Sequence, residues 1–236
     1  SSFEGELPYV ISSHEPFLTV DLRNTKGEGL TVDFSDAEAS LYRGRWVPFA
    51  ELKLAGLKRE ADPMIAVPAS ETVAVKCPSC GAPHEITAPG RSQLLVCQFC
   101  DSSLDARNPE LTKLGDVMER AGEIAKWAKI PIGTTGQLSD GQYRVIGMVQ
   151  NMTESYGQTY RWKDYLLYNH LTGYRWLNEN NGHYTLFEQL YAIPESSSTK
   201  RRGFSFKHRP VGMPGPNYIM VDGKKNLHLI QQRYRF

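Results

Sequence analysis

The 236-residue sequence has only four cysteines, no long apolar run and no excess of one charge. Lysine and arginine total 27 against 26 for aspartate and glutamate. This balance excludes a global electrostatic attraction to nucleic acid, although not a local basic patch. A membrane-spanning helix needs about 18 consecutive apolar residues, and the chain has none. With 40% hydrophobic and 22% charged residues, the composition is that of a globular protein.

Sequence motifs of the common enzyme classes are also missing. There is no glycine-rich phosphate loop after a strand, no HExxH and no GxSxG. Asp164 and Glu179 are conceivable acid–base carboxylates, but nothing in the sequence brings them together. The histidines are scattered without ligand spacing, at His14, His84, His170, His183, His208 and His228. We therefore expect no catalytic residues and no enzyme activity; an enzyme with a site that motifs do not reveal is the alternative.

The four cysteines all lie in one stretch, KCPSCGAPHEITAPGRSQLLVCQFCD. Cys77, Cys80, Cys97 and Cys100 form the pattern C-x2-C-x16-C-x2-C, which is typical of a zinc site. Each CxxC turn directs two sulfurs to one side, and two turns supply four thiolates at about 2.3 Å from the ion. Gly81 and Asp101 follow the second cysteine of each pair and tolerate a left-handed backbone. The sequence predicts a structural Zn²⁺, because four thiolates leave no open position for catalysis.

Two other roles for the cysteines are disfavoured. Disulfides require an oxidising compartment, and no secretory signal opens the chain, so we expect a cytoplasmic protein. A redox CxxC usually begins a helix, and neither pair does. His84 lies near but is expected to be a strand residue rather than a fifth ligand. Between the pairs, HEIT and QLLVC read as two strands of one hairpin, which makes residues 76–107 a zinc ribbon.

The remaining segments predict a mainly β fold. It consists of two small antiparallel β domains, each a barrel or curled sheet, that flank the ribbon, with one connecting amphipathic α-helix. Residues 1–60 are β-rich, 61–75 form a linker, 108–130 form the helix, and 131–236 form the second β domain with a loop at 194–203. Because the chain begins Ser1-Ser2-Phe3 without methionine, we expect it to be a piece of a longer protein.

The predicted strands, turns and helix rest on local sequence patterns. Apolar and polar residues alternate in FLTVDL and in LTVDF, which lie on either side of a turn at 25–29 and so predict a hairpin. ASLYRGRWVPF predicts a second strand pair that turns near Arg43-Gly44. Asn108 is a plausible N-cap, Pro109 suits the first helical position, and apolar residues follow three and four apart. Turns at 139–141, 171–173 and 180–182 divide the later segment into a meander, with Asn181-Gly182 the strongest hairpin signal.

Several motifs together resemble the bacterial domain of unknown function family 4178. They are CPSCGAP with its second CxxC, then GTTGQL, YRVIG, WKDYLLYN, GYRWLN and GHY, within residues 77–190. From about Gly203 onward the chain departs from the pattern expected of that family. The resemblance implies a zinc ribbon followed by a β-rich domain that can occur in more than one copy, and it implies no catalytic residues. It also implies an accessory or scaffold role in an envelope-stress or membrane-associated setting.

These observations lead to a functional expectation with one further alternative. We expect a zinc-stabilised scaffold or adaptor that acts in protein–protein assembly, with unnamed protein partners and with peripheral membrane association conceivable. The alternative is single-stranded nucleic-acid binding, since aromatic and basic residues alternate in one region and aromatic rings can stack on bases. That region contains Trp162, Tyr165, Tyr168, Tyr174, Trp176 and Tyr184, with Arg161, Lys163 and Arg175 between them. Ordinary cross-strand packing of the same aromatics is favoured over stacking.

Overall fold

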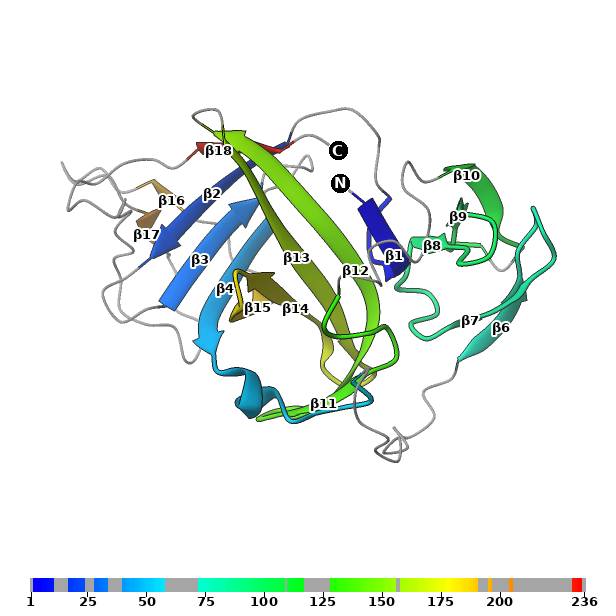
Figure 1. Cartoon of the computed structure of the whole chain (residues 1–236), viewed down its shortest axis with the longest axis horizontal. Coiled ribbons are helices and arrows are strands. Elements are labelled where there is room, and N and C mark those ends of the chain that lie inside the picture. The colour runs from blue at the N-terminus through cyan, green and yellow to red at the C-terminus, as the bar shows by residue number, and fades with distance from the viewer. Residues whose placement is uncertain are drawn as a thin grey trace.

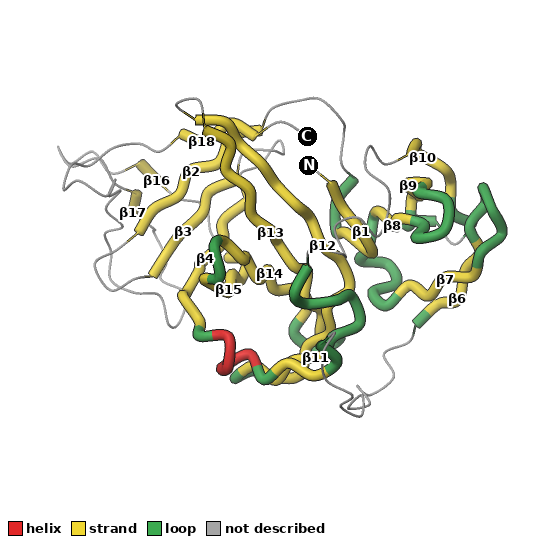
Figure 2. The backbone as a smooth tube through the Cα atoms, viewed as in Figure 1, coloured by secondary structure: helices red, strands yellow, loops and turns green. Residues whose placement is uncertain are grey.

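Strands make up nearly all the regular structure in the described part of the chain (Figures 1 and 2). The computed structural model describes residues 2–10, 17–23, 28–33, 40–57, 72–108, 110–116, 128–155, 158–190, 195–196, 204–205 and 231–234. Before the cysteines lie β1 (Ser2–Leu7), β2 (Phe17–Arg23), β3 (Glu28–Asp33), β4 (Ser40–Val47), the 3-10 helix η1 (Phe49–Leu52) and β5 (Leu54–Ala55). Around the cysteines lie β6 (Val73–Lys76), β7 (Pro83–Ile86), β8 (Leu94–Val96), β9 (Ser102–Asp105) and β10 (Thr112–Asp116), and these five strands with their turns, a wider region than the predicted 76–107, are called the ribbon from here on.

The later strands form a meander of long hairpins. They are β11 (Thr135–Leu138), β12 (Gly141–Ser155), β13 (Gln158–Asn169), β14 (Gly173–Asn180) and β15 (His183–Leu190), followed by β16 (Glu195–Ser196), β17 (Phe204–Ser205) and β18 (Gln231–Tyr234). Asn181 and Gly182 adopt positive φ angles of 50° and 79° between β14 and β15. Two positive φ angles are what a tight two-residue hairpin turn requires, so this predicted turn is confirmed.

One antiparallel sheet of 14 strands joins most of these elements. Its order is β10-β9-β8-β1-β12-β13-β14-β15-β4-β3-β2-β18, with β11 and β5 attached beside β12. The predicted mainly β, antiparallel fold is confirmed. This order is a path with two open ends, so hydrogen bonding among the described strands does not close a barrel, which was one of the two forms expected beside a curled sheet.

The expectation of two separate β domains on either side of the ribbon is wrong. Strand β4, from the first sixty residues, pairs with β15 from Tyr184↔Val47 to Leu190↔Leu41, and β1 pairs with β12. The early and late segments therefore build one sheet. Pattern reasoning divided them because both consist of short hairpins, and alternation within a strand does not reveal a partner that is far away in sequence.

The strand pair predicted to turn near Arg43-Gly44 is also absent, because β4 runs through these residues. A Cβ at Gly44 would lie 2.4 Å from Cε1 of Phe187 on the neighbouring strand. Glycine is needed here to leave room for an aromatic ring and not to reverse the chain.

The connecting helix is not found in the described part of 108–130. Leu111 has a positive φ of 43°, its N–H donates to the carbonyl of Asn108 at 3.1 Å, and the chain continues as β10. Leu111 is buried at 3% exposure in the ribbon core, whereas Leu114 is 45% exposed. Leu111 and Leu114, which the apolar spacing assigned to one buried face of a helix, therefore differ in burial. Residues 117–127 of the predicted helix lie outside the described residues.

Strand β1 connects the main sheet to the ribbon (Figure 1). Its first half, Ser2 to Gly5, pairs with β12, and Glu6 and Leu7 pair with β8. A Cβ at Gly5 would lie 2.3 Å from the carbonyl oxygen of Ile146, and a Cβ at Gly147 would lie 1.9 Å from that of Glu6. The two paired backbones approach each other closely at a bulge in β12, and this approach leaves no room for a Cβ atom at Gly5 or Gly147.

The predicted linker and loop fall mostly outside the described residues. Of the linker 61–75, the described part includes the start of β6, and of the loop 194–203 it includes β16, which pairs with β17. Strand β18 pairs with β2. Among the described residues, no helix is long and apolar enough to cross a bilayer.

Candidate metal centre

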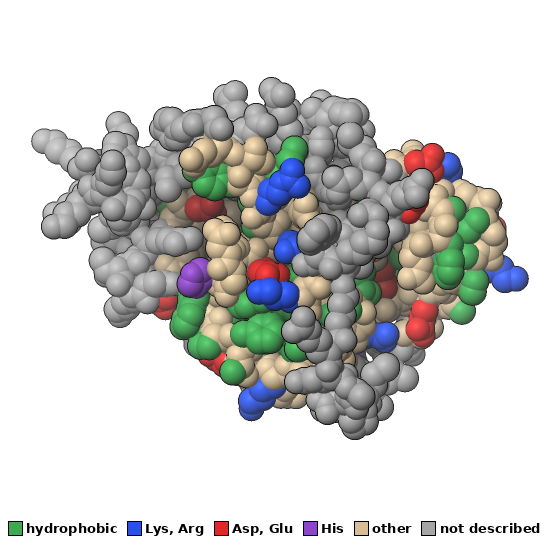
Figure 3. Space-filling model, viewed as in Figure 1, with side chains coloured by type: hydrophobic (Ala, Val, Ile, Leu, Met, Phe, Trp, Pro, Cys, Tyr) green, Lys and Arg blue, Asp and Glu red, His purple; other side chains and the backbone are tan. Residues whose placement is uncertain are grey.

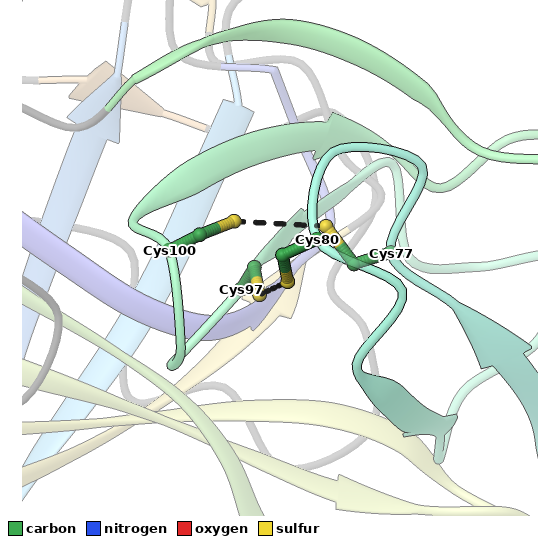
Figure 4. Close-up of side chains that lie close together, drawn as sticks. All are labelled: Cys77, Cys80, Cys97 and Cys100. Atoms are coloured by element: carbon green, nitrogen blue, oxygen red, sulfur yellow. Dashed lines mark hydrogen bonds between the residues drawn. The ribbon is translucent and has the colours of Figure 1, made fainter.

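The four cysteines converge at one point of the ribbon (Figure 4). Their four sulfurs all lie within 4.8 Å of one another, and the Sγ–Sγ distances of Cys77 to Cys100 and of Cys80 to Cys97 are both 3.7 Å. Four sulfurs at about 2.3 Å from a tetrahedral ion would lie about 3.8 Å apart. None of the four is in a disulfide. The arrangement is compatible with a metal ion such as zinc.

Two nearly identical turns position these sulfurs. The N–H of Gly81 donates to the carbonyl of Cys77 at 2.8 Å, and the N–H of Asp101 donates to that of Cys97 at 3.0 Å. Gly81 and Asp101 have φ angles of 76° and 59°, as predicted for the residue after each pair. A second bond closes each turn, since the Cys77 N–H donates to Ala82 and the Cys97 N–H to Ser102, both at 2.9 Å.

Each cysteine turn joins the two strands of a separate hairpin. The prediction of a single hairpin between the two CxxC pairs is therefore wrong. The first turn joins β6 to β7, and the second joins β8 to β9. HEIT and QLLVC belong to β7 and β8, which do not pair with each other. Because the two hairpins share only a small apolar core around the sulfurs, a metal ion would be the strongest link between them.

Hydrogen bonding and burial give the four thiols unequal tendencies to ionise. Burial raises the pKa of the Cys97 thiol to about 12, although the N–H groups of Phe99 and Cys100 act against it. The hydroxyl and the amide of Ser102 lower the pKa of Cys100 to about 6. Ser102 Oγ lies 3.3 Å from the Cys100 sulfur. A bound metal would hold all four cysteines as thiolates. The protein must then provide hydrogen-bond donors to the sulfurs that are out of contact with water.

The Glu6 side chain holds the ribbon to the main sheet. Its carboxylate, 3% exposed, accepts from the N–H groups of Thr87 at 2.6 Å and Ala88 at 3.1 Å, and from Ser92 Oγ at 2.6 Å. It also lies on the strand that pairs with β8. Sequence reasoning missed Glu6, because a carboxylate 81 residues away from the loop it caps gives no local signal.

The carboxylates considered from sequence do not form an acid–base pair. Asp164 accepts from Asn151 at 2.6 Å and Asn178 at 2.7 Å, while Glu179 accepts from the Tyr165 hydroxyl at 2.6 Å. Asp164 pairs in register with Asn178, one residue before Glu179, so the two carboxylates point to opposite faces of the sheet. Burial raises the pKa of Asp164 to about 6.

The aromatic region is largely packed into the sheet. Tyr165, Tyr168 and Tyr184 are buried, and Tyr174 and Trp176 pack against the buried residues of β12 and β13. The Trp162 indole N–H donates to Asp164 at 3.1 Å. Most of these rings are therefore not presented as an open surface on which bases could stack.

A comparison with protein families finds a match in the later part of the chain. Residues 131–231 match the family described as a domain of unknown function, DUF4178. The match begins after the ribbon and extends past Gly203 to residue 231, so the expected departure from the family pattern at Gly203 is wrong, and the ribbon itself lies outside the matched residues. Neither the curated proteins nor the solved structures contain a significant match.

Proposed function

We propose that this protein is a non-enzymatic, zinc-stabilised β-rich module that acts in protein–protein assembly. The observation that carries the proposal is the cluster of four sulfurs within 4.8 Å of one another. Four thiolates complete a tetrahedral shell, so a zinc ion held by them has no position left for water or substrate.

Zinc is the metal that best fits this donor set. Thiolate-only tetrahedral sites favour zinc or iron–sulfur centres over calcium or magnesium, which require oxygen ligands. The two hairpins that provide the sulfurs are short, and the apolar core around the sulfurs contains eight buried residues among those described, two of which are the candidate ligands Cys77 and Cys97. Such a small core supplies little hydrophobic stability alone, so zinc binding would supply much of the folding free energy of the ribbon.

The ribbon also offers apolar side chains to a partner. Val73, Phe99 and Leu114 are exposed, and Phe99 is 63% exposed at the tip of the second cysteine turn. Figure 3 shows hydrophobic side chains gathered on the ribbon lobe, with acidic and basic side chains around them. Exposed aromatic residues with a polar surround are common at protein interfaces. An accessory part of an envelope-stress or membrane-associated system is the setting that we propose for the partner.

The test is affinity capture with the full chain and two variants. Phe99→Ser and Leu171→Ser each remove one exposed apolar side chain, the first on the ribbon and the second, 80% exposed, at a turn of the main sheet. We expect a co-purifying protein that is lost with Phe99→Ser and kept with Leu171→Ser. Elution of the wild-type chain alone, with nothing captured, would remove the assembly proposal.

Nucleic-acid binding is measured in the same preparation. A single-stranded oligonucleotide bound at micromolar protein, with an affinity that falls steeply as salt rises, would replace assembly by the alternative function. We expect no such binding, because most of the aromatic rings that would stack on bases are packed against the sheet.

A further inference from the structure

His84 contacts the metal centre without belonging to it. Its Nε2 atom lies 3.2 Å from the sulfur of Cys97, a distance within hydrogen-bonding range for a sulfur acceptor. Among the described residues, the set of candidate ligand atoms within 4.8 Å of one another contains the four sulfurs and not a nitrogen of His84. The histidine is therefore placed beside one ligand and not at a fifth coordination position.

Cys97 is the ligand for which such a contact matters most. It is fully buried at 0% exposure, whereas Cys80 is exposed and can be solvated by water. A buried thiolate loses the stabilisation that water gives to its charge, so protein donors must replace it. The N–H groups of Phe99 and Cys100 are two such donors, and His84 Nε2 is a side-chain donor at hydrogen-bonding distance.

The position of the His84 ring is fixed from both sides. His84 lies on β7 opposite Val75, which is buried in the ribbon core, and its ring lies 5.9 Å from that of Phe99, which belongs to the second cysteine turn. The ring thus connects the first hairpin to the second, beside the sulfur of Cys97.

We propose that His84 is an outer-sphere positioning residue of the metal centre, which donates its Nε2–H to the Cys97 thiolate and so strengthens metal binding. The proposal rests on the proposed function, because it requires a metal held by the four cysteines. Nε2 can carry a proton in both the neutral and the charged imidazole, so the hydrogen bond does not depend on a change of protonation. Partners of this kind typically alter metal affinity by about 10- to 100-fold when they are removed.

The experiment uses cobalt(II) as a spectroscopic probe in the full chain. Four proteins are compared: wild type, His84→Leu, His84→Gln and, as a control, His183→Leu, which changes an exposed histidine at the start of β15. Cobalt affinity is measured by competition with a chelator, and the sulfur-to-cobalt charge-transfer bands report the number of thiolates and the energy of their electrons.

We expect His84→Leu to weaken cobalt binding about 10- to 100-fold while the four-thiolate spectrum remains. Loss of a hydrogen bond raises the energy of the sulfur electrons, so the charge-transfer bands of this variant are expected to move to longer wavelength. His84→Gln, which keeps an N–H donor, is expected to recover part of both effects, and His183→Leu is expected to match wild type. A merely structural role for His84 would not shift the bands.

Three different results would overturn different claims. Equal affinity and equal band positions in wild type and His84→Leu would overturn the role of His84 and leave the metal site intact. A wild-type spectrum of three thiolates and one nitrogen would make His84 a ligand and overturn its outer-sphere role. A wild-type chain that binds no cobalt would overturn the proposed metal site, and with it this inference.

Discussion

A single methyl group at the close contact between the paired strands β1 and β12 is expected to destabilise the protein severely. In Gly147→Ala the new Cβ would lie 1.9 Å from the carbonyl oxygen of Glu6, whereas ordinary contacts begin at 3.4 Å, so the strands must separate by about 1.5 Å. The obstacle is backbone, which cannot rotate away as a side chain could. Separation at this point would also disturb the pairing of Glu6 with β8.

The expected loss of unfolding free energy is at least about 3 kcal/mol, the upper end of the range for overpacked sites. For a chain of this size, about 3 kcal/mol lowers the midpoint of thermal unfolding by roughly 6–12 °C. The matched control is Gly29→Ala on β3, where a Cβ would lie 3.7 Å from the carbonyl of Leu22 and the backbone φ is not positive. This control is expected to change stability by less than about 1 kcal/mol.

Both variants are compared by urea unfolding of the metal-loaded protein, with the slope of each transition checked against wild type. The reasoning is refuted if Gly147→Ala is as stable as Gly29→Ala within about 0.5 kcal/mol, because β1 and β12 would then not approach each other as closely as described.

Three further predictions concern the ribbon and the main sheet. Cys97→Ser, or removal of metal by a chelator, is expected to lower the stability of the ribbon sharply, seen as loss of its amide protection in hydrogen exchange; unchanged protection would contradict a folding role for the metal. Glu6→Ala is expected to cost about 3 kcal/mol in urea unfolding, because it leaves buried donors unpaired, while Glu85→Ala at an exposed position costs little. Burial raises the folded-state pKa of Asp164 to about 6. The protonated carboxyl group of Asp164 therefore stabilises the folded state fully below the ordinary pKa of an aspartate, and this stabilisation, at most about 3 kcal/mol, is lost as pH rises through about 6. Asp164→Asn is expected to flatten this part of the pH profile, and an equally steep profile in the variant would refute the assignment.

The parts of the molecule that sequence predicts well are those specified by neighbouring residues. Two cysteines with two residues between them, followed by Gly81 or Asp101, form a turn whose geometry depends on a handful of adjacent backbone angles. Asn181-Gly182 is a signal of the same local kind. These patterns correctly predicted the sulfur cluster and the hairpin of β14 and β15.

The parts that sequence does not predict depend on partners far along the chain. The pairing of β4 with β15 and that of β1 with β12 join residues more than a hundred positions apart, and no local pattern encodes them. Gly44 illustrates the same limit. Its sequence context predicted a turn, but in the structure this glycine leaves room for the ring of Phe187 on the neighbouring strand. At Leu111, burial in the ribbon core overrides a helical spacing of apolar residues.

The measurement that tests the central claim most directly is X-ray absorption at the zinc edge of the full chain, purified with its metal. We expect one zinc per chain and a single shell of four sulfur neighbours at about 2.3 Å. A shell that contains nitrogen or oxygen at about 2.0–2.1 Å, or a metal-free chain with its cysteines in disulfides, would contradict a closed structural centre.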